Sequence, residues 1–253
     1  MNRRSLLLAG LGATIAIPAA AATQPWSARL LKGGFDGSRY WTGLHVSLEE
    51  GWKTYWRIPG DGGIAPQIDV KGANLKSALV SYPLPTRYKI ETGEAIGYKH
   101  EVVFPIALEV RDSAMPLNIS LSSFIGVCDI VCIPAQFDGA VDFIAARADA
   151  PDQPMISTWL SKAPKLVTDK PVKSASAILH QGEPHLRLLL TEPVNDIFVE
   201  GETSHYFQAP ILTKDTALIK ASGAKSLKEL KGTSLRITCD VGNHGLEQLV
   251  TVG

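Results

Sequence analysis

The sequence predicts an all-β fold of antiparallel strands, and three observations lead to this prediction. Glycine and proline are frequent, with 22 and 16 among 253 residues, and they separate short apolar stretches. Several of these stretches alternate apolar and polar residues, which places the apolar side chains on one face of a strand. Segments with the 3.6-residue period of a helix are almost absent. Short strands separated by turn signals at this spacing are typical of a β-sandwich or a β-barrel.

The strands expected in the first half follow one another closely. Residues 40–48 alternate, with Leu44 and Val46 among the apolar members. Residues 51–58 place Trp52, Thr54 and Trp56 on one face and Lys53, Tyr55 and Arg57 on the other. Residues 59–63, "PGDGG", form a turn cluster that no helix tolerates. Further strands are expected in the segments "KSALVSYPLP", "HEVVFPIALEV", "LNISLSSFIGV" and "GAVDFIAA".

A short helix marks the boundary between two parts of the chain. Residues 154–164 are bracketed by prolines and follow the polar stretch "ARADAPDQP", which has the composition of a linker. Strand signals then resume in "HLRLLLTE", "NDIFVEG", "TSLRITCDVG" and "LEQLVTVG", with one helical turn expected in "SLKELKG". We therefore expect two β domains, residues 24–148 and 168–253, joined by a linker with a short helix at 149–167. The second domain is the smaller.

The amino terminus predicts export. Arg3 and Arg4 precede an apolar run from Leu6, and the small residues 19–22 offer a cleavage site near Ala22. Residues 1–22 are therefore expected to be a signal peptide, used by the general secretory or the twin-arginine route. No other segment approaches the length of a membrane helix, so we expect no membrane span in the mature chain.

The charge balance and the absence of known motifs exclude several function classes. Lys and Arg together number 25, as do Asp and Glu, and no basic stripe is present, which argues against a nucleic-acid partner. The chain contains no G-x-S-x-G elbow, no H-E-x-x-H sequence and no P-loop. Hydrolase and nucleotide chemistry therefore have no support.

Cys128 and Cys132, four positions apart in "GVCDIVCIP", are the candidate chemical groups. As a structural disulfide they would add only about 2 kcal/mol to the free energy of unfolding, because the loop that they close is short. A metal site is a second interpretation, and a dithiol that cycles between reduced and oxidised states is a third. The neighbouring acid Asp129 disfavours a thiolate, so we expect a partner protein to supply the attacking sulfur. The third cysteine, Cys239, is in phase with apolar residues and is expected to be a buried, inert thiol.

The order of several segments carries a family resemblance. "GWKTYWRIPGDGGIAPQID", "YPLPTRY", "IGYKHEVVFPI" and "CDIVCIP" together resemble the amino-terminal periplasmic domain of the DsbD thiol–disulfide interchange proteins, and most closely the stand-alone and ScsB-type members. The resemblance covers roughly residues 40–143. The later segment "LKELKGTSLRIT" more loosely resembles the second β domain of ScsB-type proteins. The resemblance implies an immunoglobulin-like β-sandwich, followed here by a second β-sandwich, and a periplasmic location.

The resemblance also implies a reaction and its partners. Cys128 and Cys132 would form a redox-active disulfide, with no other cofactor and no metal. They would pass electrons from a membrane-embedded transporter of the DsbD or CcdA type to periplasmic thioredoxin-like proteins, as in a protein-disulfide reductase. The chain contains neither the transmembrane domain nor the thioredoxin-like domain of the family, so the electron donor is expected to be a separate protein.

A cap segment shields the cysteine pair in this family until a partner docks. By its order along the chain, the cap corresponds to residues 88–98, where glycines at 93 and 97 permit movement. The candidate cap residues are Tyr88, Ile90, Glu91, Glu94, Ile96 and Tyr98.

Two other functions stay open. The chain is alternatively a two-domain periplasmic chaperone or adaptor, or a copper-handling module, whose cysteines merely close a loop. The reduction potential of the cysteine pair discriminates between these, because a structural disulfide is much harder to reduce than a carrier disulfide.

Overall fold

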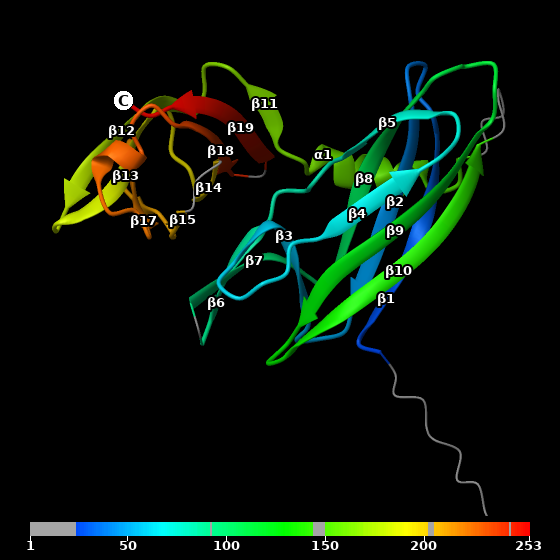
Figure 1. Ribbon diagram of the computed structural model, residues 1–253, viewed down its shortest axis with the longest axis horizontal. Coiled ribbons are helices and arrows are strands. Elements are labelled where there is room, and N and C mark those ends of the chain that lie inside the picture. Colours follow the sequence, from blue (N-terminus) through cyan, green and yellow to red (C-terminus); the bar gives the residue numbers. More distant parts are fainter. Residues whose placement is uncertain (1–23, 92, 144–149, 202–204, 243) are drawn as a thin grey trace, which may run out of the picture.

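The computed structural model describes residues 24–91, 93–143, 150–201, 205–242 and 244–253, which are almost entirely β-structure (Figure 1). The all-β prediction is therefore confirmed. The predicted signal peptide lies outside the described residues. None of the helices in this described part is long and apolar enough to cross a membrane.

Two antiparallel sheets form the amino-terminal part. The first has the order β1 (Trp26–Phe35), β2 (Tyr40–Leu48), β8 (Glu101–Val110) and β5 (Leu75–Val80). The second has the order β10 (Cys132–Phe143), β9 (Leu117–Cys128), β3 (Lys53–Gly60), β7 (Gly93–Lys99) and β6 (Thr86–Ile90), and β4 (Gln67–Lys71) also pairs with β9.

The first hydrophobic core lies between these two sheets. Along β9 the burial alternates, with Leu117, Ile119 and Leu121 buried and Asn118 and Ser120 between them exposed. This is the period of two expected for a strand with one face against a core and one in solvent. The opposite sheet contributes Leu44 and Phe104, both fully buried. The sandwich thus follows directly from the alternation in the sequence.

The expected helix is present and packs against the first sandwich. α1 (Gln153–Ser161) buries Ile156 completely against Leu31 and Val103. Asp152, just before the helix, accepts a hydrogen bond from the backbone N–H of Lys32 at 2.8 Å. The segment after the first sandwich is therefore fastened to it.

The carboxy-terminal part also contains two sheets. One has the order β11 (Lys165–Val167), β19 (His244–Thr251), β18 (Ser234–Val241) and β14 (Asp196–Gly201). The other has the order β12 (Val172–His180), β13 (Glu183–Leu190), β17 (Thr216–Ser222) and β15 (Tyr206–Phe207), with β16 (Ile211–Leu212) also on β17. The expected helical turn is a 3₁₀ turn at Leu227–Glu229. A second core of Leu, Ile, Val and Ala side chains lies between these sheets.

The two cores favour the division of the chain that the sequence predicts, and we retain it as a proposal. One detail differs from the expected linker at 149–167. Residues 165–167 form β11, which pairs in parallel with β19 and so extends a sheet of the second part. The linker is thus shorter than predicted, because its last residues complete a sheet.

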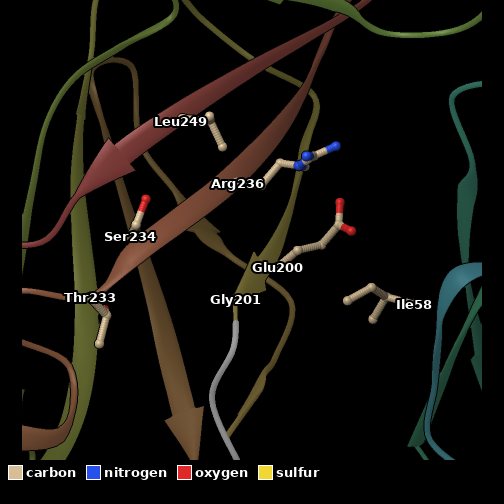
Figure 2. A pocket seen from close by; sticks show the side chains of 7 residues that line it. All are labelled: Ile58, Glu200, Gly201, Thr233, Ser234, Arg236 and Leu249. Carbon is tan, nitrogen blue, oxygen red and sulfur yellow. The ribbon is translucent and has the colours of Figure 1, made fainter.

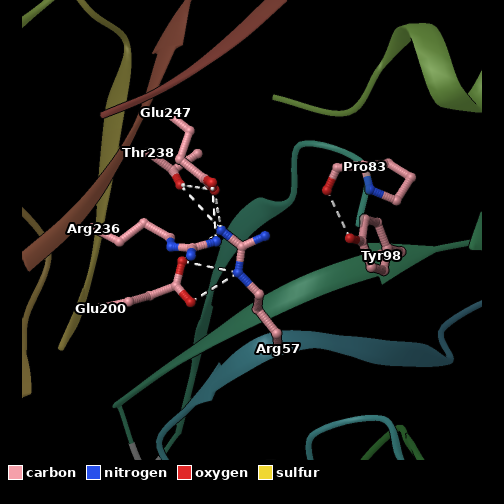
Figure 3. A network of polar contacts seen from close by, with 7 residues as sticks. All are labelled: Arg57, Pro83, Tyr98, Glu200, Arg236, Thr238 and Glu247. Atoms are coloured by element: carbon pink, nitrogen blue, oxygen red, sulfur yellow. Dashed lines mark hydrogen bonds and ion pairs between the residues drawn. The ribbon is translucent and has the colours of Figure 1, made fainter. Parts of the chain in front are cut away.

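The two parts share an interface that is both apolar and charged. Trp56, fully buried on β3, packs against Phe198 on β14, with ring centroids 5.4 Å apart. Next to it, Arg57 donates hydrogen bonds to Glu200 and Glu247 of the second part (Figure 3). Such buried charge pairs add little net stability but are costly to break singly, so they fix how two surfaces meet.

Candidate functional site

The two candidate cysteines face each other at the end of one β-hairpin. β9 and β10 pair in unbroken antiparallel register from Leu117–Phe143 to Cys128–Cys132. The sulfur atoms of Cys128 and Cys132 form a disulfide, and their Cα atoms are 4.1 Å apart. Only residues 129–131 lie between the two strands. The pair therefore lies across a tight loop at the end of two strands.

The two halves of the disulfide differ in exposure. Cys128 is 2% exposed, whereas Cys132 is exposed to solvent. The loop between them presents Ile130 and Val131, which are 93% and 69% exposed. Thiol–disulfide exchange depends on which sulfur an attacking thiolate can reach. Cys132 is therefore the more accessible cysteine of the pair.

Strand β3 contributes two side chains beneath the disulfide. Lys53 is the register partner of Cys128 and is only 8% exposed. Its Nζ donates hydrogen bonds to the carbonyl oxygen of Cys128 at 3.4 Å and of Asp129 at 3.0 Å. A buried ammonium group therefore holds the start of the cysteine loop.

Tyr55, two residues along the same strand, lies against the second sulfur. Its hydroxyl oxygen is 3.6 Å from Sγ of Cys132, and the side chain is almost fully buried. Burial raises the pKa of the Tyr55 phenol, so the hydroxyl keeps its proton at neutral pH. Tyr55 can therefore donate a hydrogen bond to sulfur, and this bond strengthens when the sulfur becomes a thiolate.

A cavity of about 470 Å³ opens beside the disulfide. Both cysteines, Lys53 and Tyr55 line it, together with Ile90 and Glu91 of the β6 end. Tyr88 and Ile90 also pack against the small buried cluster of Tyr55, Ala95 and Cys128. Three of the candidate cap residues, Tyr88, Ile90 and Glu91, thus lie where the sequence analysis expected them, next to the cysteine pair.

The other three candidate cap residues have different neighbours. Ile96 and Tyr98 are buried in the main core, and the Tyr98 hydroxyl donates to the carbonyl of Pro83 at 2.7 Å (Figure 3). Glu94 forms an ion pair with Arg87.

The register of the hairpin explains this division. Ile90 pairs with Gly93, so the side chains that share a face have even numbers on β6 and odd numbers on β7. Even-numbered residues of β7 therefore point away from the disulfide. We restrict the proposed cap to Tyr88, Ile90 and Glu91.

The turn cluster at 59–63 is hydrogen-bonded to the hairpin of β6 and β7. The backbone N–H of Asp61 donates to the carbonyl of Glu94 at 2.8 Å, and the Asp61 carboxylate accepts from the N–H of Glu94 at 3.1 Å. Gly60 has a φ of 83°, and a Cβ atom there would lie 2.4 Å from the Glu94 carbonyl oxygen. Glycine at position 60 thus permits this close approach.

A larger cavity, of about 720 Å³, lies away from the sulfurs, between β3 and the second sandwich (Figure 2). It is an open depression lined by Ile58 and by Glu200, Arg236 and Leu249 of the second part. Glu200 and Arg236 also contact the Arg57 network at the interface. Because it contains neither cysteine, we place the candidate site at the smaller cavity.

The sequence analysis did not identify Lys53, Tyr55 and Asp61 as site residues. A signal for two of them was present, because Lys53 and Tyr55 alternate on the face of their strand opposite Thr54 and Trp56. The sequence does not show that this second face is also covered, by the hairpin of β6 and β7 and by the cysteine loop.

Comparison with known proteins finds similarity to thiol–disulfide interchange proteins. Residues 20–140 match the family model described as the thiol:disulfide interchange protein DsbD, N-terminal. The crystal structure of the N-terminal periplasmic domain of ScsB from Proteus mirabilis is similar, with a TM-score of 0.71 at 22% identity, over 94% of this chain and 96% of that chain. At this identity the likeness establishes the fold, and the predicted immunoglobulin-like architecture is confirmed.

A second solved structure is more distant. The N-terminal domain of DsbD from Neisseria meningitidis in the reduced form covers 46% of this chain and 90% of that chain, at 16% identity and a TM-score of 0.26, and we base no argument on it. No curated protein sequence matches this chain.

Proposed function

We propose that this protein, whose residues 20–140 match the family model of the DsbD amino-terminal domain, carries reducing equivalents through the Cys128–Cys132 pair. It accepts electrons from a membrane-embedded transporter of the DsbD or CcdA type and delivers them to periplasmic thioredoxin-like proteins. The predicted signal peptide, residues 1–22, exports the chain to the periplasm, where disulfides persist. The observation that carries the proposal is the disulfide itself, which joins an exposed residue, Cys132, to a buried residue, Cys128.

Reduction of the disulfide proceeds in two exchange steps. A donor thiolate attacks Sγ of Cys132, the S–S bond breaks, and its electron pair passes to Sγ of Cys128, which takes up a proton. The second thiolate of the donor then attacks the donor sulfur of the mixed disulfide and releases Cys132, which also takes up a proton. The donor dithiol is oxidised to a disulfide, and the cysteine pair gains two electrons and two protons. Delivery to an acceptor disulfide is the reverse sequence.

Lys53 and Tyr55 assist the two sulfurs differently. Lys53 is a positive charge at the carbonyls of the cysteine loop, and it favours the thiolate that forms on Cys128 in the first step. Tyr55 donates its hydroxyl hydrogen to Sγ of Cys132 and favours the thiolate that leaves in the second step. Both effects lower the barrier for a leaving sulfur.

The tip of the β6–β7 hairpin shields this chemistry. Ile90 and Glu91 line the cavity at the disulfide, and Tyr88 packs against the Cys128 cluster. We propose that these three residues cover the Cys128 side of the disulfide, that they exclude small oxidants there, and that a docking partner displaces them.

A trapping experiment tests the order of attack. A thioredoxin-like protein that lacks its resolving cysteine is activated with a thiol-displaceable group and mixed with variants of this chain that lack one cysteine of the pair. The Cys128→Ser variant, which keeps the exposed Cys132, is expected to form the mixed disulfide at least about tenfold faster than Cys132→Ser. Equal rates, or no adduct with either variant, would contradict the proposal.

A redox titration separates this proposal from a chaperone or adaptor. The Cys128–Cys132 pair is equilibrated with glutathione or dithiothreitol buffers, and the fraction of disulfide is read by mass after alkylation. A reduction potential between roughly −300 and −120 mV is expected for a carrier. A much lower potential would show that the bond is structural.

A further inference from the structure

The β6–β7 hairpin, which we call the cap hairpin (Thr86–Ile90 and Gly93–Lys99), has two faces with different partners. One face presents Tyr88, Ile90 and Ala95 to the cluster that contains Cys128. The opposite face, set by the register Arg87–Ile96 and Lys89–Glu94, carries Arg87 and Glu94. These two charged side chains lie toward the second part of the chain.

Arg87 links the cap hairpin to strand β14 of the second part. Its Nε donates a hydrogen bond to Asp196 at 3.0 Å, and its Nη2 donates to the carbonyl of Ile197 at 2.9 Å. The guanidinium also lies over the ring of Phe198, 4.9 Å from the centroid. Only 12% of the Arg87 side chain and 21% of the Asp196 side chain are exposed. A guanidinium that is bonded and stacked in this way has little freedom to leave.

Glu94 links the other strand of the hairpin to the second part. The Tyr206 hydroxyl of β15 donates a hydrogen bond to Glu94 Oε1 at 2.6 Å. Burial and the nearby Glu94 charge raise the pKa of Tyr206, so the phenol remains a donor. Glu94 also forms an ion pair with Arg87, in which Nη1 and Oε1 are 2.8 Å apart. The contacts from Asp196 and Tyr206 thus meet in one network on the hairpin.

These contacts lie close to the part of the hairpin that covers the disulfide. Glu94 follows Gly93, which pairs directly with Ile90 at the tip. Displacing Ile90 and Glu91 therefore strains the hydrogen bond between Tyr206 and Glu94 on β7. Turning β6 outward strains the contacts of Arg87 with Asp196 and Ile197. A rigid two-stranded unit cannot tilt at its tip without moving these contacts.

We propose that the second part of the chain holds the cap hairpin closed over the disulfide, with Asp196 and Tyr206 as the positioning residues. This inference rests on the proposed shielding function of the hairpin. Asp196 and Tyr206 touch neither sulfur and act only through Arg87 and Glu94. A partner that binds at this junction and competes for Arg87 or Glu94 would release the cap.

The test measures how fast a small reductant reaches the disulfide. The oxidised full chain is mixed with tris(2-carboxyethyl)phosphine, and the second-order rate constant of reduction is followed by alkylation and mass. The double variant Asp196→Asn/Tyr206→Phe keeps the shape of both side chains but removes the charge and the hydroxyl. We expect it to react on the order of tenfold faster than the unchanged protein, because hydrogen bonds to charged groups are lost.

A matched control separates release of the cap from general weakening of the interface. Glu200→Gln disturbs the same interface at Arg57, which lies on β3 and not on the cap hairpin. This variant is expected to leave the rate constant within about twofold. Thermal unfolding of both variants shows whether their losses of stability are comparable. Equal acceleration by both variants, or none by the double variant, would overturn the proposal.

A third variant distinguishes the failure of this inference from failure of the shielding itself. Ile90→Ala shortens the side chain at the tip and leaves Arg87 and Glu94 in place. If Ile90→Ala accelerates reduction and the double variant does not, the cap shields but the second part does not hold it. If neither accelerates reduction, the proposed shielding is wrong.

Discussion

Reduction of the Cys128–Cys132 disulfide is expected to leave the protein folded and to lower its free energy of unfolding by no more than about 2 kcal/mol. The bond closes a loop of only five residues, for which the loss of chain entropy in the unfolded state gives this value. The paired strands β9 and β10 place the two cysteines opposite each other, and we expect this pairing to persist in the reduced form. By a thermodynamic cycle, folding therefore favours the disulfide over the dithiol by the same amount, or about 45 mV for two electrons.

The assay is urea unfolding of the oxidised and reduced forms, followed by tryptophan fluorescence. Both are made in a Cys239→Ala background, since the third thiol is buried when folded but free to exchange when unfolded. With a denaturant slope of about 2 kcal/mol per molar, the two midpoints should differ by about 1 M or less. A difference above about 4 kcal/mol, or unfolding by the reductant alone, would refute the reasoning, because the bond would then be a structural one.

Three further predictions follow from single side chains. Lys53→Met should lower the reduction potential of the cysteine pair by at least about 30 mV, because a positive charge that favours the thiolate form is lost; an unchanged potential would contradict this. Asp152→Asn should reduce stability by about 1 kcal/mol at pH 7 and by less at a pH below the usual carboxyl pKa. Burial raises the pKa of Asp152, but the hydrogen bonds from the Lys32 N–H and Arg29 outweigh it and lower the pKa overall. The stability that the ionised Asp152 contributes is therefore present above the usual carboxyl pKa and is lost on acidification. Urea titrations that gave an equal loss of stability at both pH values would disprove this prediction. Burial raises the pKa of Cys239 to about 12, so iodoacetamide at pH 8 should label this thiol only in the unfolded protein, and rapid labelling of the native form would show that the site is open.

The sequence predicts the sandwich well wherever one face of a strand meets the core and the other meets water. Residues 40–48 coincide with β2, and the alternation of residues 117–127 places β9 correctly up to its last residue. In these strands the sequence pattern and the observed burial agree, because each strand is covered on one face by the opposite sheet and meets solvent on the other.

The rest of the site depends on contacts that no local pattern records. Strand β3 buries both of its faces at Thr54 and Tyr55, because the cap hairpin covers the face that would otherwise meet solvent. The division of the cap candidates at the hairpin tip depends on the Ile90–Gly93 register, which the order of residues alone does not specify. The links from Arg87 to Asp196 join positions 109 residues apart.

The packing of Trp56 on Phe198 limits how the chain can be divided for experiments. A fragment that ended before the second sandwich would present the indole of Trp56 to water and would leave Arg57 and Arg87 without their carboxylate partners on β14. Such a fragment is expected to self-associate through this bare apolar surface, and its cysteines would react as those of an uncovered hairpin. Redox constants measured on the isolated first sandwich therefore describe a different molecule from the intact protein.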